Sequence, residues 1–375
     1  MIYLDYSATT PVDKRVLDSF NKACLDYPGN ANSIHSLGVK SNALINAATK
    51  QISEILGVLP SEIIYTSGSS ESNNLAIKGI CEKYQNRGKH IITTKYEHSS
   101  IYGPISYLQR HGFEVDFVES DELGRVDLDS LKKLIREDTI LVSITSVNSE
   151  IGIMNPIEEI ANILKEYPKI FFHVDMTQSI GKYKIELKNI DLISMSAHKI
   201  FGLKGIGMLI KKEKIMLEPI IHGGKSTTVF RSGTPALPLI VSLSKALRLI
   251  YENIDENYQK VKRLNLILRE KLQTISNIYI NSNEVCSPYV LNISAVGVKP
   301  ETMVHALEEH EIYISTQTAC SSNDTLSKAV LELTKDIDRA STSLRISLSY
   351  LTTEEEIETF LKVFEECFNK LSNIK

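Results

Sequence analysis

Short apolar, β-rich runs alternate with helical stretches from about residue 60 to residue 211, and this alternation most constrains the fold. Several of the runs are almost wholly apolar, as strands covered on both faces should be. The expected strands are 63–65, 90–94, 113–118, 139–145, 170–174, 191–195 and 207–210. The expected helices between them are 71–84, 100–111, 129–137 and 157–166. The pattern predicts an α/β fold with a mostly parallel sheet and helices on both faces.

The pattern changes after Pro238, where two long helices are expected at 239–252 and 256–275. A smaller α+β region follows. Its expected strands are 278–280, 289–294, 312–315 and 344–348, and its expected helices are 300–309, 326–333 and 353–371. We place a boundary near residue 255, with a large domain at 15–255 and a small domain formed by 1–14 and 256–375.

The composition excludes several classes of protein. The chain has 42 Lys and Arg residues and 46 Asp and Glu residues, which gives a formal net charge of −4. It therefore lacks the positive charge that would attract nucleic acid. No run of about 18 apolar residues predicts a membrane helix, and the N-terminus lacks a signal-peptide pattern. The cysteines number five and form no C-x-x-C, which argues against a disulfide framework or a zinc site. We therefore expect a cytoplasmic protein without metal.

The first candidate site follows the expected strand 63–65, in the segment Thr66-Ser67-Gly68-Ser69-Ser70-Glu71-Ser72-Asn73. Gly68 permits a tight turn, hydroxyl side chains follow, and a helix begins. Backbone N–H groups at a helix start, aided by these hydroxyls, would hold a phosphate. The segment matches neither common glycine-rich nucleotide pattern, and a plain capped turn is the alternative.

Two further candidates stand at strand ends. Asp175 directly follows the expected strand 170–174, at its carboxyl end, and open α/β sheets bind ligands at the carboxyl ends of their strands. Its carboxylate could pair with a protonated ring nitrogen or cap a helix. Lys199 follows the expected strand 191–195 and is either a Schiff-base lysine or a surface lysine. A phosphate cradle, a carboxylate and a lysine are together what pyridoxal phosphate needs as anchor, ring partner and covalent tether.

Four more residues could carry chemistry. Cys320 lies in a small, polar, loop-like stretch and is either a reactive thiol or an inert surface one. Arg345 lies within an apolar strand and needs a carboxylate, either from a ligand or from a protein acid. His98 and Asn148 each follow a strand end; for His98, stacking or proton transfer competes with the role of an ordinary loop histidine.

Taken together, the motifs resemble those of the cysteine desulfurases of the NifS/IscS-like group, within the class V aminotransferase family. Each motif is weak alone, and together they are highly specific. The matching segments are 3–11, 29–36, 66–68, 71–74, 97–98, 148–152, 173–179, 196–199, 231–234 and 318–320. The resemblance implies the fold type I architecture of pyridoxal-phosphate enzymes, with a doubly wound, mainly parallel seven-stranded sheet and a small α+β domain. It also implies a homodimer with active sites at the interface.

The resemblance assigns roles to the candidate residues. Lys199 should hold pyridoxal 5'-phosphate as a Schiff base, and Cys320 should take sulfur from L-cysteine as a persulfide, leaving L-alanine. Asn148 and Arg345 should bind the substrate carboxylate, and His98 is expected to stack on the ring or accept the Cys320 proton. The residues implied to bind the cofactor are Ser69, Ser70, His98, Asp175, Gln178, Ser196, His198, Lys199 and, from the other subunit, Thr234.

The expected partner is a sulfur-acceptor protein, for iron–sulfur cluster assembly or for tRNA or thiamine thiolation, with no direct nucleic-acid or membrane contact. Residues 225–230 depart from the glycine-rich segment common in the family. The alternatives are a selenocysteine lyase or a small-amino-acid aminotransferase of the same family, and a non-catalytic scaffold that binds a sulfur-transfer partner.

Overall fold

The computed structural model describes residues 1–316 and 326–372, and within them the main sheet has seven strands in the order β2-β8-β7-β6-β5-β3-β4. The strands are β2 (Ile63–Thr66), β3 (His90–Thr93), β4 (Glu114–Phe117), β5 (Thr139–Thr145), β6 (Phe171–Asp175), β7 (Leu192–Ser196) and β8 (Gly207–Lys211). Strand β8 is antiparallel to β2 and β7, and the other pairs are parallel. The carboxyl ends of the remaining strands therefore meet at one edge.

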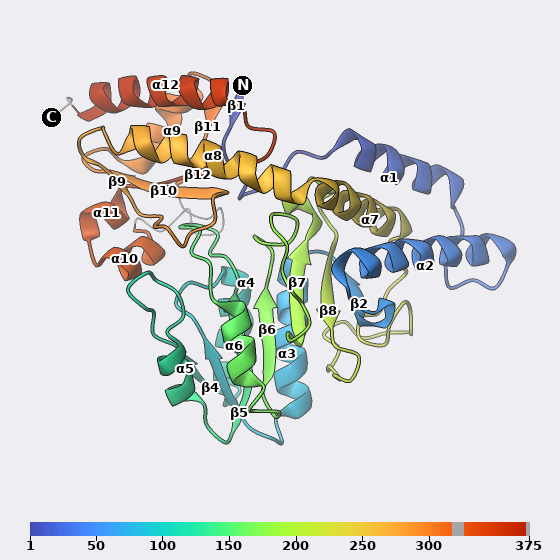
Figure 1. Cartoon of the computed structure of the whole chain (residues 1–375). Helices are drawn as coiled ribbons and strands as arrows, with labels where there is room; N and C mark the ends of the chain where they lie inside the picture. The colour runs from blue at the N-terminus through green and yellow to red at the C-terminus, as the bar shows by residue number, and fades with distance from the viewer. Residues whose placement is uncertain (317–325, 373–375) are drawn as a thin grey trace.

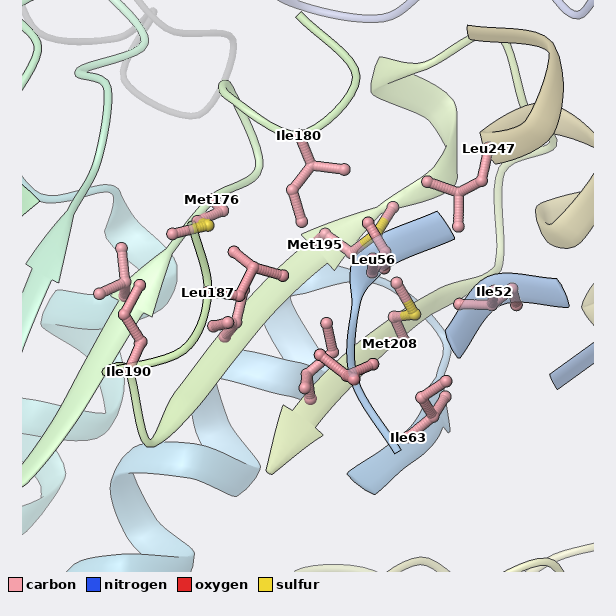
Figure 2. Close-up of a cluster of buried hydrophobic side chains, with 14 of the residues drawn as sticks. Ile52, Leu56, Ile63, Met176, Ile180, Leu187, Ile190, Met195, Met208 and Leu247 are labelled. Atoms are coloured by element: carbon pink, nitrogen blue, oxygen red, sulfur yellow. The ribbon is translucent and has the colours of Figure 1, made fainter. Parts of the chain in front are cut away.

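Helices cover both faces of this sheet because neighbouring strand residues point to opposite sides. On β2, Ile64 packs with α3 (Ser69–Tyr84) and α4 (Ser99–Arg110), whereas Ile63 packs in the cluster on the other face. Helices α2 (Ser36–Leu56), α6 (Ile157–Leu164) and α7 (Leu237–Glu252) contribute to that second cluster. Figure 2 shows part of it, where Leu56 and Leu247 meet Met195 of β7.

A small antiparallel sheet lies at one end of the molecule (Figure 1). Its strands are β9 (Ile278–Ile280), β10 (Val290–Ala295) and β12 (Ser343–Ser347), in the order β12-β10-β9. Apolar residues of α8 (Ile254–Leu272), α9 (Pro300–Glu308) and α12 (Glu354–Ser372) share its core. Strand β1 (Ile2–Tyr3) pairs with β11 (Ile312–Tyr313), which brings the N-terminus to the same end. This pairing supports the proposed small domain of 1–14 and 256–375.

The expected strands are confirmed, with ends that differ by at most two residues. Helix α1 (Lys14–Asp26) and helix α2 pack against α7 and were not predicted from the pattern. The remaining helices are α5 (Leu128–Leu134), α10 (Lys328–Thr334) and α11 (Ile337–Ser341). In the part of the chain that the structure describes, no helix combines the length and the apolar character needed to span a membrane.

Candidate active site

The carboxyl edge of the main sheet holds a cavity of about 200 Å³. The residues predicted from the sequence that line it are Ser69, Ser70, His98, Asp175, Gln178, His198, Lys199 and Arg345. They come from the ends of β2, β3, β6 and β7 and from β12 of the small sheet. The topology thus brings together side chains that are far apart in the sequence, as the strand-end argument predicts.

Lys199 ends the short 3₁₀ turn 197–199 that directly follows β7. Its Nζ donates hydrogen bonds to the backbone oxygens of Ser7, at 2.5 Å, and Ala8, at 2.8 Å. The backbone N–H of Thr10 donates to the oxygen of His198 at 2.9 Å, which fixes the N-terminal segment against this turn. The N-terminal segment therefore forms one wall of the cavity, and the lysine amine is directed into it.

Asp175 is the last residue of β6, and its carboxylate is held at both oxygens. Oδ1 accepts hydrogen bonds from the backbone N–H of Thr177, at 2.9 Å, and from its hydroxyl, at 2.5 Å. Oδ2 accepts a hydrogen bond from Nδ2 of Asn73 at 2.8 Å. A buried carboxylate oriented in this way suits a protonated ring nitrogen, because such a charge needs an ionised partner.

His98 precedes α4, and its ring is oriented by Ser100. The backbone N–H of Ser100 donates to Nδ1 at 3.1 Å, and the hydroxyl of Ser100 lies 2.8 Å from the same atom. Because Nδ1 accepts from the backbone N–H, it carries no proton of its own, so the Ser100 hydroxyl, which accepts from Asn73 Nδ2 at 2.9 Å, donates its proton to Nδ1. Burial, and secondarily the charge of Lys199, lower the pKa of His98. The ring is therefore neutral near pH 7 and carries its proton on Nε2.

The predicted phosphate cradle lies where β2 turns into α3. Gly68 has a φ of 156°, and a Cβ on it would lie 3.3 Å from Oγ of Ser196. A Cβ on Gly207 would lie 2.7 Å from the Cα of Gly68. The strand β8 can approach the turn at Gly68 this closely because Gly207 carries no side chain. Burial lowers the pKa of the neighbouring His198 to about 4, with Lys199 adding to the effect.

Arg345 is 1% exposed, and Asp5 is the protein acid that the sequence left open as one of its two possible partners. Its guanidinium lines the cavity, and Nη2 also forms an ion pair with Oδ1 of Asp5 at 2.7 Å. Nη1 donates to the backbone oxygen of Ser149 at 3.2 Å. Nε is buried without a hydrogen-bond partner among the described residues. The arginine thus retains a donor for a further carboxylate.

A second cavity, of about 670 Å³, adjoins the first and shares Tyr96, His98 and Ser149 with it. Asn148 lines this cavity, and its amide holds the local turn: Nδ2 donates to the oxygen of Tyr96, and Oδ1 accepts from the N–H of Ile151. Lys328 and Ala329 form another part of the lining.

A comparison with protein-family models matches the class V aminotransferase family, described as "Aminotransferase class-V", over residues 2–360. The chain belongs to this family. Because the match runs through both sheets, it covers the cavity and each of the elements that line it.

Similar proteins cover the whole length of this class V aminotransferase family member. A NifS/IcsS protein homolog of Lactobacillus delbrueckii subsp. bulgaricus is 38% identical, over 100% of this chain and 99% of its own. The cysteine desulfurase IscS of Buchnera aphidicola subsp. Acyrthosiphon pisum is 40% identical, over 100% of this chain and 94% of its own.

Solved structures show the same fold. A NifS-like protein matches with a TM-score of 0.93 at 35% identity, covering 99% of this chain and 100% of its own. The structure described as SspA in complex with cysteine matches with a TM-score of 0.82 at 32% identity, covering 94% of this chain and 100% of its own. The doubly wound α/β fold of type I pyridoxal-phosphate enzymes, expected from the sequence, is confirmed.

Three of the described residues that were predicted for the site do not line the smaller cavity. They are Asn148, which lines the wider cavity, Thr234, which is exposed, and Ser196, which is buried beside Gly68. Cys320 lies outside the described residues. The atypical segment 225–230 ends on Phe230, whose ring centroid lies 4.7 Å from Nζ of Lys211.

Sequence reasoning did not single out Asn73, Thr177, Lys182 and the backbone oxygen of Ser7, all of which contact the predicted residues. Asn73, Thr177 and Ser7 do fall within matching segments, 71–74, 173–179 and 3–11. Those segments are the signal that could have found these three residues. Nothing in the sequence shows that Lys182 is buried, because its pattern is that of any lysine in a turn.

Proposed function

We propose that this chain is a pyridoxal-phosphate-dependent cysteine desulfurase, in which Lys199 carries the cofactor and Cys320 takes the sulfur. The observation that carries the proposal is the juxtaposition of Lys199 and Asp175 in one cavity at the carboxyl ends of β6 and β7. An amine and a buried carboxylate on neighbouring strand ends suit a covalent tether and a ring-nitrogen partner. Relatives named cysteine desulfurase, at about 40% identity over the full chain, support the same activity.

The residues present fit the cofactor. The cradle beside Gly68, with Ser69, Ser70 and His198, would hold the phosphate, and Asp175 would keep a proton on the ring nitrogen. When bound, pyridoxal phosphate supplies an aldehyde carbon for amines and a ring that takes up the electron pair of a substrate C–H bond. Lys199, once exchanged for the substrate amine, is placed to remove the Cα proton with Nζ.

We place Arg345 at the carboxylate of the substrate, because its guanidinium lines the cavity and has a buried Nε without a partner among the described residues. His98 presents Nε2–H as its second ring nitrogen, so in this tautomer Nε2 donates a hydrogen bond and does not accept the Cys320 proton. The wider cavity, which shares His98 with the site, gives the substrate an approach. Its lining residue Lys328 follows shortly after the segment that carries Cys320.

The sulfur step balances without a further reactant. The Cys320 thiolate attacks the sulfur of L-cysteine, an S–S bond forms and the C–S bond breaks. Cys320 is left as a persulfide, and the carbon skeleton, after protonation, leaves as L-alanine.

We propose that an acceptor protein then removes the outer sulfur from Cys320. We also propose that this protein acts as a cytoplasmic homodimer. Exposed apolar side chains on α1 and in the loop before α2 support a second copy, with Leu25 80% and Ile34 98% exposed.

The experiment is turnover of L-cysteine by the cofactor-loaded protein, with sulfide measured after thiol reduction and alanine quantified beside it. Equal amounts of sulfide and alanine are expected. Cys320→Ala should lower the rate by at least about 100-fold. The matched control is Cys24→Ala, since Cys24 is an exposed thiol on α1. Full activity in Cys320→Ala would show that the nucleophile is assigned wrongly, and mercaptopyruvate in place of alanine and sulfide would indicate an aminotransferase.

A further inference from the structure

A second lysine lies beside the proposed cofactor site and has no part in the reaction above. Lys182 is 8% exposed, and its Nζ donates a hydrogen bond to Oε1 of Gln178 at 2.6 Å. The same Nζ lies 5.5 Å from the centroid of the Tyr289 ring. The charges that act on it, from Lys199 and Arg345, are both positive. A buried amine in such surroundings destabilises the fold, so its stabilising contacts alone do not explain its position.

Gln178 can be oriented in only one way between its two partners. Its Nε2 donates to the backbone oxygen of Ser7 at 3.0 Å, and its Oε1 accepts from Lys182. Rotating the amide by 180° would face the NH₂ group toward the lysine donor and Oε1 toward the Ser7 oxygen. The contact of Oε1 with the Ser7 oxygen would then be repulsive in either protonation state of Lys182, because a carbonyl oxygen only accepts. The contact of the NH₂ group with the ammonium form of Lys182 would be repulsive as well.

The oriented N–H group of Gln178 lies close to the tether. Nζ of Lys199 donates to the same Ser7 oxygen that Gln178 contacts, and both side chains line the same cavity. In pyridoxal phosphate the ring hydroxyl is next to the carbon that joins the lysine. A donor beside Nζ of Lys199 is therefore beside the ring hydroxyl oxygen.

We infer that Lys182 is a positioning residue, which holds the Gln178 amide with its N–H group toward the cofactor's ring oxygen. The inference rests on the proposed function and deepens it. The lysine acts in either protonation state, since both the amine and the ammonium have protons to donate to Oε1. Burial, with Lys199 and Arg345, lowers its pKa to about 7, so near neutrality it exists in both states.

The test is Lys182→Met, loaded with pyridoxal phosphate and titrated by visible absorption from acid to alkaline pH. A hydrogen bond to the ring oxygen stabilises the negative charge on that oxygen. The charge then attracts the proton of the neighbouring Schiff-base nitrogen less strongly, so the pKa of this nitrogen is lower when the hydrogen bond is present. Its loss should raise the midpoint of the absorption change by about one pH unit. The thermal midpoint of Lys182→Met should equal or exceed that of the wild type, because a buried amine is removed. If Lys182 had only a structural role, the thermal midpoint of the variant would fall.

The matched control is Lys211→Met. Lys211 is equally buried, at 2% exposed, and its Nζ donates to backbone oxygens away from the cavity. This variant should keep the wild-type absorption midpoint. In a Gln178→Leu background, Lys182→Met should add no further shift, since the group it positions is gone. Equal midpoints for Lys182→Met and wild type, or additive shifts in the double variant, would overturn the inference.

Lys182→Arg is the second variant, for the case in which Lys182→Met does not fold. It keeps donors and a permanent charge, so its midpoint should equal or lie below that of the wild type, and a rise would overturn the inference. Failure of the proposed function would appear differently, because the wild-type protein itself would then bind no cofactor or yield no sulfide.

Discussion

Asn73 links two groups of the site that lie on different elements. Its Nδ2 donates both to Asp175, at 2.8 Å, and to Ser100, at 2.9 Å, and Ser100 in turn contacts His98. One amide therefore contacts the carboxylate directly and the histidine through the Ser100 hydroxyl. A substitution at Asn73 should therefore act locally, because both of these hydrogen bonds depend on its side chain alone.

Asn73→Ala should weaken pyridoxal-phosphate binding about 10-fold, because a charged acceptor loses one of its donors. Cofactor titration of the unloaded protein measures this. The neighbouring Asn74→Ala is the control, since Asn74 donates to the backbone of its own helix at Ser70. An unchanged dissociation constant in Asn73→Ala would remove this residue from the site.

At the scale of elements, the site depends on how β2, β6 and β7 end. The register pairs Thr66 of β2 with Gly207 of β8, and a Cβ on Gly207 would lie 2.5 Å from the backbone oxygen of Met195. Gly207→Ala should therefore lower the free energy of unfolding by roughly 1–3 kcal/mol and weaken phosphate binding. Gly103→Ala, which has open space and lies within α4, should be neutral or stabilising. Equal thermal midpoints for the two variants would contradict the tight β2–β8 approach.

His173 lies in the middle of β6, between Ser143 of β5 and Ser194 of β7, and contacts both hydroxyls at 2.9 Å. Burial lowers its pKa to about 4, so the unfolded chain binds a proton between pH 6.5 and 4 that the folded chain does not. Its contribution to stability is present above pH 6.5 and is lost as the pH falls toward 4.

His173→Gln should reduce the acid sensitivity of the fold. Between pH 7 and pH 4 the wild type should lose roughly 2–3 kcal/mol more of its unfolding free energy than the variant. Urea titrations at each pH measure the difference, with His305→Gln, at an exposed position on α9, as the control. If the unfolding free energies of wild type and His173→Gln changed in parallel with pH, the lowered pKa of His173 would be contradicted.

At the scale of the whole molecule, exposed apolar side chains near the start of α2 predict a dimer. The particle mass should be about twice the 42.1 kDa of one chain. Ile34→Asp should shift it toward the monomer, because it would bury an unpaired charge at a shared surface. Ile337→Asp is the control: it is 67% exposed on α11, at the opposite end of the molecule in Figure 1. A monomeric wild type under the same conditions would contradict the proposal.

Much of the fold could be predicted from the sequence, because its strands are nearly all apolar and alternate regularly with helical stretches. Asp175 and Lys199 could be predicted since strand ends locate them. Contacts between distant segments could not be predicted. The pair of Asp5 with Arg345 joins residues 340 positions apart, and it forms because Leu4 and Asp5 run beside β12, where the backbone N–H of Ser347 donates to the oxygen of Leu4. Helices α1 and α2 were not predicted from the pattern; both pack against α7, which lies far along the chain.

The most direct test of the account is where the cofactor is attached. Borohydride reduction of the pyridoxal-phosphate-loaded protein, followed by digestion and mass spectrometry of the peptides, identifies the modified lysine. The account predicts the label on the peptide that contains Lys199. A label on Lys182, the other buried lysine beside the cavity, or the absence of any label on the loaded protein would contradict it.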